Sequence, residues 1–185
     1  AIAESLIKER GFHGFSYQDV AERVGIRKAS IHYHFPTKAD MGTAVLRRYR
    51  AMMRRAAEQV AASPDSFDGW QALALFLTPI RPFGQSAPDA CLCGTLSGEY
   101  LSLPEPMRAE IADFFAEHIA WVTAVLERGR ATGDFRFVGP AEPLARFLLS
   151  AIEGAMMIKR TSGDTSFLDE VIAQHDRNEA AVAEA

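Results

Sequence analysis

The 185-residue sequence predicts an all-α fold, and three observations support that prediction. Apolar residues recur at helical spacing over most of the chain, and the longest such stretch is 105–132. The sequence shows no strand-like alternation of useful length. Glycine and proline stand where one helical pattern ends and the next begins. We expect a small three-helix domain over residues 1–47 and a larger helical domain over 48–185.

The first three helical patterns are short and have clear local signals at their ends. The first covers 1–10 and starts without a Met, so we expect the N-terminus to be trimmed. Ser16 is a good N-cap for the second helix, and Asp19 three residues later completes a capping box. Gly25 ends this helix, and the third follows over about 27–33.

Two short helices joined by a glycine are typical of a helix-turn-helix. The third helix turns Ala29 and Ile31 inward and offers basic and hydroxyl groups outward. Such a helix fits a DNA major groove, where Arg or Lys pairs with guanine. Thr37 and Asp40 predict a second capping box, whose free amides can face a phosphate. The candidate DNA-binding residues are Ser16, Tyr17, Gln18, Arg27, Lys28, Ser30, His32, Tyr33, His34, Thr37 and Lys38.

The segment GFHGFSYQDVAERVGIRKASIHYHFPTKADMGTAVL closely resembles the N-terminal domain of TetR/AcrR-type transcriptional repressors. Arg27 and His32 depart from the family pattern, where a small hydroxyl residue and a tyrosine are usual. The resemblance implies a homodimeric regulator that binds a palindromic operator. It also implies that a ligand in the C-terminal domain shifts the helix starting at Lys38 and so changes the separation of the recognition helices. The matching positions are Ser16, Val20-Ala21, Gly25-Ile26, Tyr33-His34-Phe35 and Thr37-Lys38.

Charge is distributed unevenly along the chain. Residues 1–60 hold 11 Lys and Arg against 6 Asp and Glu, a net of +5, whereas the rest hold 9 against 18, a net of −9. A basic N-terminal part, here called the head, followed by an acidic remainder is typical of a protein that binds nucleic-acid phosphates through one part of its chain. No apolar run reaches 18 residues, so we expect no membrane partner. No secretory signal is visible and the cysteines are few, so we expect the cytoplasm.

A long fourth helix is predicted over 38–62, before Ser63-Pro64. Its predicted apolar stripe is Met41, Val45, Met52 and Val60. We interpret its charged residues as a solvated face, and these are Arg47, Arg48, Arg50, Arg54 and Arg55. Further helices are expected over 67–80, from Asp89 or Ala90 to 101, and over 105–132, 140–161 and 167–175, with a loop over 81–88.

Small residues on the helix over 140–161 predict a close helix contact. In a two-fold dimer this face would form half of an antiparallel helix bundle, and two heads on a palindrome multiply affinity. Packing within one chain is the open alternative. The candidate dimer-interface residues are Leu148, Ala151, Gly154, Ala155 and Ile158.

Aromatic residues of the second domain predict a mostly apolar small-molecule site with a few polar groups. An ordinary hydrophobic core is the alternative for each of them. The candidate ligand-binding residues are Phe76, Phe83, Cys91, Thr95, Tyr100, Phe114, His118, Trp121 and Met156.

The Cys91-x-Cys93 pair leaves three interpretations open. Metal binding would need further ligands at suitable spacing, and only the distant His118 is available, so we expect no metal and no cofactor. Buried structural thiols are the default. The third is sensing of oxidants or electrophiles through Cys91, which lies nearer the start of its helix.

Catalysis has little support in the sequence. No G-x-S-x-G, P-loop or H-E-x-x-H motif is present, so we expect no enzyme. The sequence thus favours a ligand-responsive transcriptional regulator, and the resemblance implies that it is a repressor. A helical small-molecule-binding or enzymatic protein without DNA binding is the alternative from another class.

Overall fold

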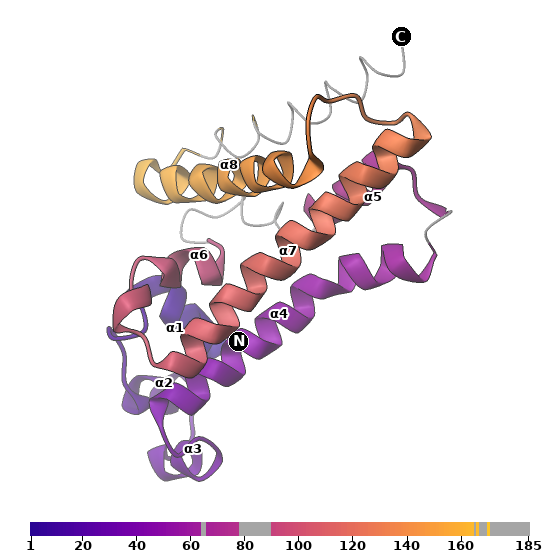
Figure 1. Ribbon diagram of the computed structural model, residues 1–185. Coiled ribbons are helices and arrows are strands. Elements are labelled where there is room, and N and C mark those ends of the chain that lie inside the picture. Colours follow the sequence, from indigo (N-terminus) through magenta and orange to yellow (C-terminus); the bar gives the residue numbers. More distant parts are fainter. Residues whose placement is uncertain (64–65, 78–89, 165, 167–169, 171–185) are drawn as a thin grey trace. The chain divides into compact units, whose positions relative to one another are not determined.

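The computed structural model describes residues 1–63, 66–77, 90–164, 166 and 170. These residues contain helices and no strand, which confirms the predicted all-α class (Figure 1). None of the described helices is both long enough and apolar enough to cross a membrane. The helices are α1 (Ile2–Arg10), α2 (Tyr17–Val24), α3 (Lys28–His34), α4 (Lys38–Ala62), α5 (Gly69–Leu77), α6 (Leu92–Ser97), the 3-10 helix η3 (Tyr100–Ser102), α7 (Glu105–Thr132) and α8 (Ala141–Ser162).

Residue packing divides the chain into two compact units. The first unit consists of Ala1–Met52 together with Ala90–Phe114, and the second contains the other described residues. The N-terminal helices therefore pack with α6, η3 and the start of α7, which lie far along the chain. The predicted boundary between two consecutive domains at residue 47 stays a prediction. The predicted loop over 81–88, and the predicted helix over 167–175 apart from residue 170, lie outside the residues that the structure describes.

Local signals define α2 as the sequence predicts. The Oγ of Ser16 accepts a hydrogen bond from the amide of Asp19, and the Asp19 carboxylate accepts one from the Ser16 amide at 2.8 Å, which completes the capping box. The Ser16 hydroxyl also donates to the Asp19 carboxylate at 2.6 Å, and this hydrogen bond, followed by that from the Ser16 amide, lowers the pKa of Asp19 to about 2. Gly25, with φ of 77°, ends the helix in the left-handed region that favours glycine.

The buried stripe of α4 differs from the predicted one. Met52 is 39% exposed, whereas its neighbour Met53 is buried. Tyr49, absent from the predicted stripe, is 1% exposed and packs its ring 5.7 Å from that of Phe114. The prediction was wrong for Met52, because several apolar residues in this helix compete for the inward face and only the packing partner selects among them. The buried members are Met41, Leu46, Tyr49, Met53 and Val60.

Within the first unit, α4 and α7 approach closely at Gly42. A Cβ at this position would lie 2.6 Å from the Sδ of Met107 and 3.0 Å from the ring of Phe12. Both neighbours are buried. The absence of a side chain therefore brings the start of α4 against α7 and against the turn that precedes α2.

The second unit has its own packed corner where α7 ends. The Trp70 Nε1 donates to the carbonyl of Asp134 at 3.0 Å, and the Trp70 and Phe135 rings meet edge to face at 4.7 Å. A Cβ at Gly129 would lie 2.2 Å from the Phe135 ring, so the ring packs directly on the helix backbone. The Phe135 amide donates to the Gly129 carbonyl at 3.0 Å and fixes the turn.

Gly129→Ala is expected to lower the free energy of unfolding by about 1–3 kcal/mol, because the added methyl overpacks the Phe135 ring. Thermal unfolding followed by circular dichroism measures the effect. Gly98→Ala is the control, since a Cβ there would only reach the Thr95 carbonyl at 3.7 Å in ordinary contact. Equal melting temperatures for the two variants would contradict the close contact.

Candidate nucleic-acid interface and effector region

The α3 helix is exposed on nearly all sides and carries the predicted DNA-binding groups. Among its seven residues, Ile31 is buried, with 5% exposure, whereas Ala29 is exposed, so the predicted inward position of Ala29 was wrong. Tyr33 is 84% exposed. The exposed predicted residues on or beside this helix are Arg27, Lys28, Ser30, His32, Tyr33 and His34. The helix thus presents cationic, hydroxyl and aromatic groups in one short stretch.

Tyr17 differs from the other candidate residues because its side chain lies inside. It is 7% exposed, and its hydroxyl donates to the carbonyl of Phe35 at 2.7 Å. Its ring also meets the His32 ring edge to face at 4.3 Å. Burial, followed by the charge of Asp40, raises the pKa of Tyr17. These contacts make Tyr17 a support for α3 rather than a group that faces DNA.

The N-terminus of α4 is capped as predicted. The Asp40 carboxylate accepts from the amide of Thr37 at 2.8 Å, and the Asp40 amide donates to the Thr37 hydroxyl at 3.1 Å. The hydrogen bond from the Thr37 hydroxyl lowers the pKa of Asp40 most, followed by that from the Thr37 amide. Two exposed residues at the start of α2, Ser16 and Gln18, are engaged locally, and the Gln18 amide donates to Glu22 at 2.8 Å.

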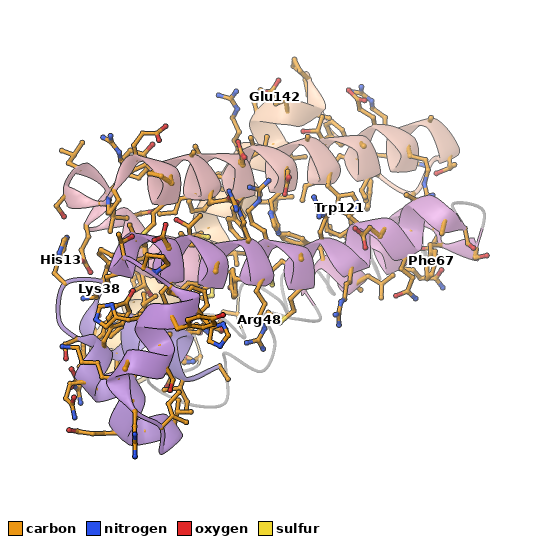
Figure 2. The ribbon with its side chains drawn as sticks, turned by 90° about the horizontal axis from the view of Figure 1, so that it is seen from below. His13, Lys38, Arg48, Phe67, Trp121 and Glu142 are labelled. Atoms are coloured by element: carbon orange, nitrogen blue, oxygen red, sulfur yellow. The ribbon has the colours of Figure 1, made fainter. Side chains whose placement is uncertain are left out.

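Lys38 is turned onto the small core rather than outward (Figure 2). Its Nζ donates to the carbonyl of Phe15 and lies 4.2 Å from the centre of the Phe15 ring and 4.8 Å from that of Phe12. Burial lowers the pKa of Lys38, although the nearby charge of Glu99 opposes that shift. Its predicted phosphate contact stays a prediction, and in this conformation the ammonium is already bonded within the protein.

The arginines of α4 have different surroundings. Arg47 and Arg50 both bind the carboxylate of Glu110 on α7, at 2.6 and 2.5 Å, and Arg50 also binds Asp113 at 3.0 Å. Burial raises the pKa of Glu110, but the hydrogen bonds from the two arginines outweigh it and lower the pKa overall. Arg48 is exposed and projects from α4 (Figure 2). The predicted solvated face therefore describes the exposed Arg47, Arg48, Arg54 and Arg55, whereas the half-buried Arg50 connects α4 to α7.

The predicted effector residues fall into both units. In the second unit, the ring of Phe76 lies 5.8 Å from that of His118 and 5.2 Å from that of Trp121. Phe76 and His118 are buried, and Trp121 is half-buried. Met156 is buried in the same unit. The structure thus brings three of the predicted aromatic residues together as one cluster.

The other predicted effector residues belong to the first unit, apart from Phe83, which lies outside the described residues. Cys91 is 3% exposed and Cys93 is fully buried. Burial, and next the neighbouring Cys91, raise the pKa of the Tyr49 phenol well above its ordinary value. Sequence reasoning missed Tyr49, although its spacing from Leu46 and Met53 on α4 could have indicated an inward position. The remaining predicted residues of this unit are the half-buried Thr95 and Tyr100 and the buried Phe114.

The α8 helix has an exposed apolar stripe. Phe147 is 66% exposed, Met157 60% and Ile158 46%. A Cβ at Gly154 would meet nothing within 4 Å. Two further predicted interface residues, Leu148 and Ala151, are half-buried, whereas Ala155 is buried within its own chain. Phe147 and Met157 therefore extend the predicted face, and Ala155 supports the core beneath it.

Metal-binding geometry is not found in the described part of the chain, where no group of three or more His, Cys, Asp or Glu side chains could hold an ion. The two cysteines, Cys91 and Cys93, are buried and are not joined by a disulfide.

Comparison with known proteins gives a consistent result. The model for "Bacterial regulatory proteins, tetR family" matches residues 1–45, and that for "Tetracyclin repressor-like, C-terminal domain" matches 74–175. A TetR-family transcriptional regulator from Agrobacterium tumefaciens is 31% identical with a TM-score of 0.83, covering 95% of this chain and 92% of that one. A TetR transcriptional regulator from Legionella pneumophila is 30% identical with a TM-score of 0.82 and the same coverage.

A curated relative is also similar in sequence over most of its length. The HTH-type transcriptional repressor DhaR of Mycobacterium sp. (strain GP1) is 24% identical over 165 residues, which is 89% of this chain and 81% of that protein. Two family models match residues 1–45 and 74–175, and two solved regulators are at least 30% identical in sequence. The chain therefore belongs to the TetR family of bacterial regulatory proteins.

Proposed function

We propose that this DNA-binding transcriptional regulator is a repressor that holds a palindromic operator as a homodimer and releases it when a small, mostly apolar effector binds. The observation that supports DNA binding most directly is α3, which buries Ile31 and exposes the basic and polar groups around it. The similar protein DhaR is a transcriptional repressor, and this similarity supports repression rather than activation.

DNA contact is assigned to α3 and to the residue that precedes it. Arg27 and Lys28 are exposed, and the Arg or Lys side chain can pair bidentately with guanine in the major groove. Ser30 can bond with any base edge. The hydroxyl of the exposed Tyr33 is suited to a phosphate.

The homodimer is assigned to α8. The exposed Phe147 and Ile158 and the half-buried Ala151 and Gly154 recur at helical spacing on one face, so a second copy of the same face can pack along it. The open space at Gly154 allows a facing helix to come near. One short recognition helix makes few base contacts, and two of them on one palindrome make the affinity specific.

Effector binding is assigned to the aromatic cluster of the second unit. Phe76 and Trp121 supply apolar area, and His118 supplies a polar group that can orient a ligand. An effector that binds better to the conformation that cannot hold the operator must weaken operator binding by the same factor. Binding is thus a shift of population between two conformations.

Salt dependence of duplex binding tests the proposal against a helical protein without DNA binding. We expect the logarithm of the affinity to fall linearly with the logarithm of salt concentration, by about 0.9 for each phosphate neutralised. Fluorescence anisotropy with a labelled random duplex measures it. Arg136→Ala, which removes an exposed cation from the second unit, is the control and should weaken duplex binding slightly or not at all. Absence of duplex binding at low salt would reject the DNA-binding role.

Sensing through Cys91 remains the second candidate mechanism, and burial of the thiol argues against it. We expect N-ethylmaleimide to leave the wild type on its operator to the same extent as Cys91→Ser, because the buried sulfur reacts slowly. Mass spectrometry and an electrophoretic shift assay measure modification and release together, with Cys93→Ser as the control. If N-ethylmaleimide released the wild type from the operator but left Cys91→Ser bound, the Cys91 thiol would be the sensor.

A further inference from the structure

The carboxylate of Glu99 lies against the turn between α1 and α2. Its Oε1 accepts the amide hydrogen of Phe12 at 3.0 Å, and its Oε2 accepts that of His13 at 3.4 Å. Glu99 precedes η3 and stands 87 residues from Phe12 in the sequence. A side chain that follows α6 therefore satisfies two backbone amides of the DNA-binding head.

The turn is shaped to receive this carboxylate. Gly11 has φ of 75°, and a Cβ on it would lie 2.0 Å from the Glu99 Oε1, so only glycine admits the carboxylate at this distance. The His13 Nε2 lies 3.2 Å from the hydroxyl of Ser102, which adds a second polar contact between the same two segments. The Ser102 hydroxyl also lies 2.8 Å from the Glu99 carbonyl, which connects the two contacts.

The charge of Glu99 also reaches the start of α4. It opposes the burial that lowers the pKa of Lys38, whose ammonium lies over the rings of Phe12 and Phe15. The Glu99 side chain is 28% exposed, so water screens these interactions only partly. One carboxylate therefore acts on the α1–α2 turn and on the first residue of α4.

We propose that Glu99 is a positioning residue that fixes the orientation of the DNA-binding helices and thereby the half-site spacing that the dimer accepts. These helices pack with α6, η3 and the start of α7 within the first unit, and both α4 and α7 continue along the chain into the second unit. The Glu99 hydrogen bonds hold the α1–α2 turn to the segment between α6 and η3, and so restrict rotation of the DNA-binding helices within this unit. The inference rests on the proposed function, because only a dimer with two heads has a preferred spacing.

Glu99→Gln tests the inference with little change in size. Glutamine keeps one oxygen acceptor but replaces the other with an NH2 donor, so one of the two backbone amides faces a donor instead of an acceptor. Glu105→Gln is the matched control, because it removes one exposed carboxylate at the start of α7 and leaves the Glu99 hydrogen bonds in place. We expect amide hydrogen exchange at Phe12 and His13 to accelerate by about tenfold or more in Glu99→Gln and to stay unchanged in the control.

Operator spacing is the second measurement. An operator is first selected from random duplexes with the wild type, and versions with one base pair added or removed between half-sites are then compared. We expect the wild type to lose about tenfold or more in affinity on the altered spacings, and Glu99→Gln to lose less than about threefold. A purely structural residue would weaken binding equally on all three spacings.

The outcomes separate the inference from the function on which it rests. Failure of the wild type to bind duplex DNA would reject the proposed function. Normal binding and spacing discrimination in Glu99→Gln, or unchanged exchange at Phe12 and His13, would overturn the inference alone. Should Glu99→Gln fail to fold, Glu99→Asp keeps the charge and shortens the reach, with the same expected results. Unfolding of both variants would make Glu99 a determinant of the fold and overturn its positioning role.

Discussion

Gly154→Leu is expected to convert the homodimer to a monomer and to lower affinity for the palindromic operator by about 100-fold or more, because the two heads no longer bind as one linked pair. The added side chain enters space that is open within the chain, since a Cβ there meets nothing within 4 Å. It would therefore disturb the facing helix of a second copy and leave its own chain folded. Sedimentation velocity and fluorescence anisotropy measure the two effects.

Glu142→Leu is the matched control, because it adds a leucine to the exposed surface of α8 about 120° around the helix from Gly154. It removes the surface pair with Arg146, and such a pair contributes only about 0.5 kcal/mol or less to stability. Non-specific binding to DNA should persist in both variants. A Gly154→Leu protein that remains dimeric would place the interface elsewhere.

Lys28→Ala and Arg27→Ala are expected to change which bases the protein prefers. Loss of a bidentate contact to guanine costs roughly 1–3 kcal/mol at that base pair and little elsewhere. Selection from random duplexes, followed by affinity measurements on single-base variants of the operator, locates the affected position. Both residues are exposed, so the substitutions should leave thermal stability nearly unchanged.

The control for these variants is Arg136→Ala, which removes an equal charge from an exposed position in the second unit. It should weaken binding slightly or not at all and leave the base preference unchanged. A uniform loss of affinity in Lys28→Ala, with the same base preference as the wild type, would move Lys28 from base recognition to phosphate contact.

Local chemistry explains why the head could be predicted from sequence. Capping by Ser16 with Asp19 and by Thr37 with Asp40 depends on residues three apart, and the stop at Gly25 depends on one residue. Each signal acts within a single turn of chain. The sequence therefore predicts the helix ends correctly without information about distant partners.

Inward and outward positions were harder to predict, because packing partners decide them. Tyr17 stands at the first position of α2, where a tyrosine beside the recognition helix can face DNA or the core. Its hydroxyl donates to the Phe35 carbonyl, and only the folded chain brings these two groups together. Likewise, the choice of Met53 over Met52 on α4 depends on what lies against that face.

Contacts distant in sequence left no pattern that sequence reasoning could use. The hydrogen bonds of Glu99 to Phe12 and His13 join segments more than 80 residues apart. The packing of residues 90–114 with the N-terminal helices has the same character. The division of the predicted effector residues between two units follows from this packing, and no spacing within the sequence indicates it.

The shortness of α3 has a consequence for the thermodynamics of operator binding. An isolated helix of seven residues is not stable in water, because its few hydrogen bonds do not offset the free-energy cost of nucleating the helix. Ile31 in the core and the Tyr17 hydroxyl on the Phe35 carbonyl keep it ordered in the free protein. The conformational entropy of the recognition helix is therefore lost during folding and not during association. Affinity for DNA is consequently coupled to the local stability of the head, and a core substitution there weakens binding without touching a base.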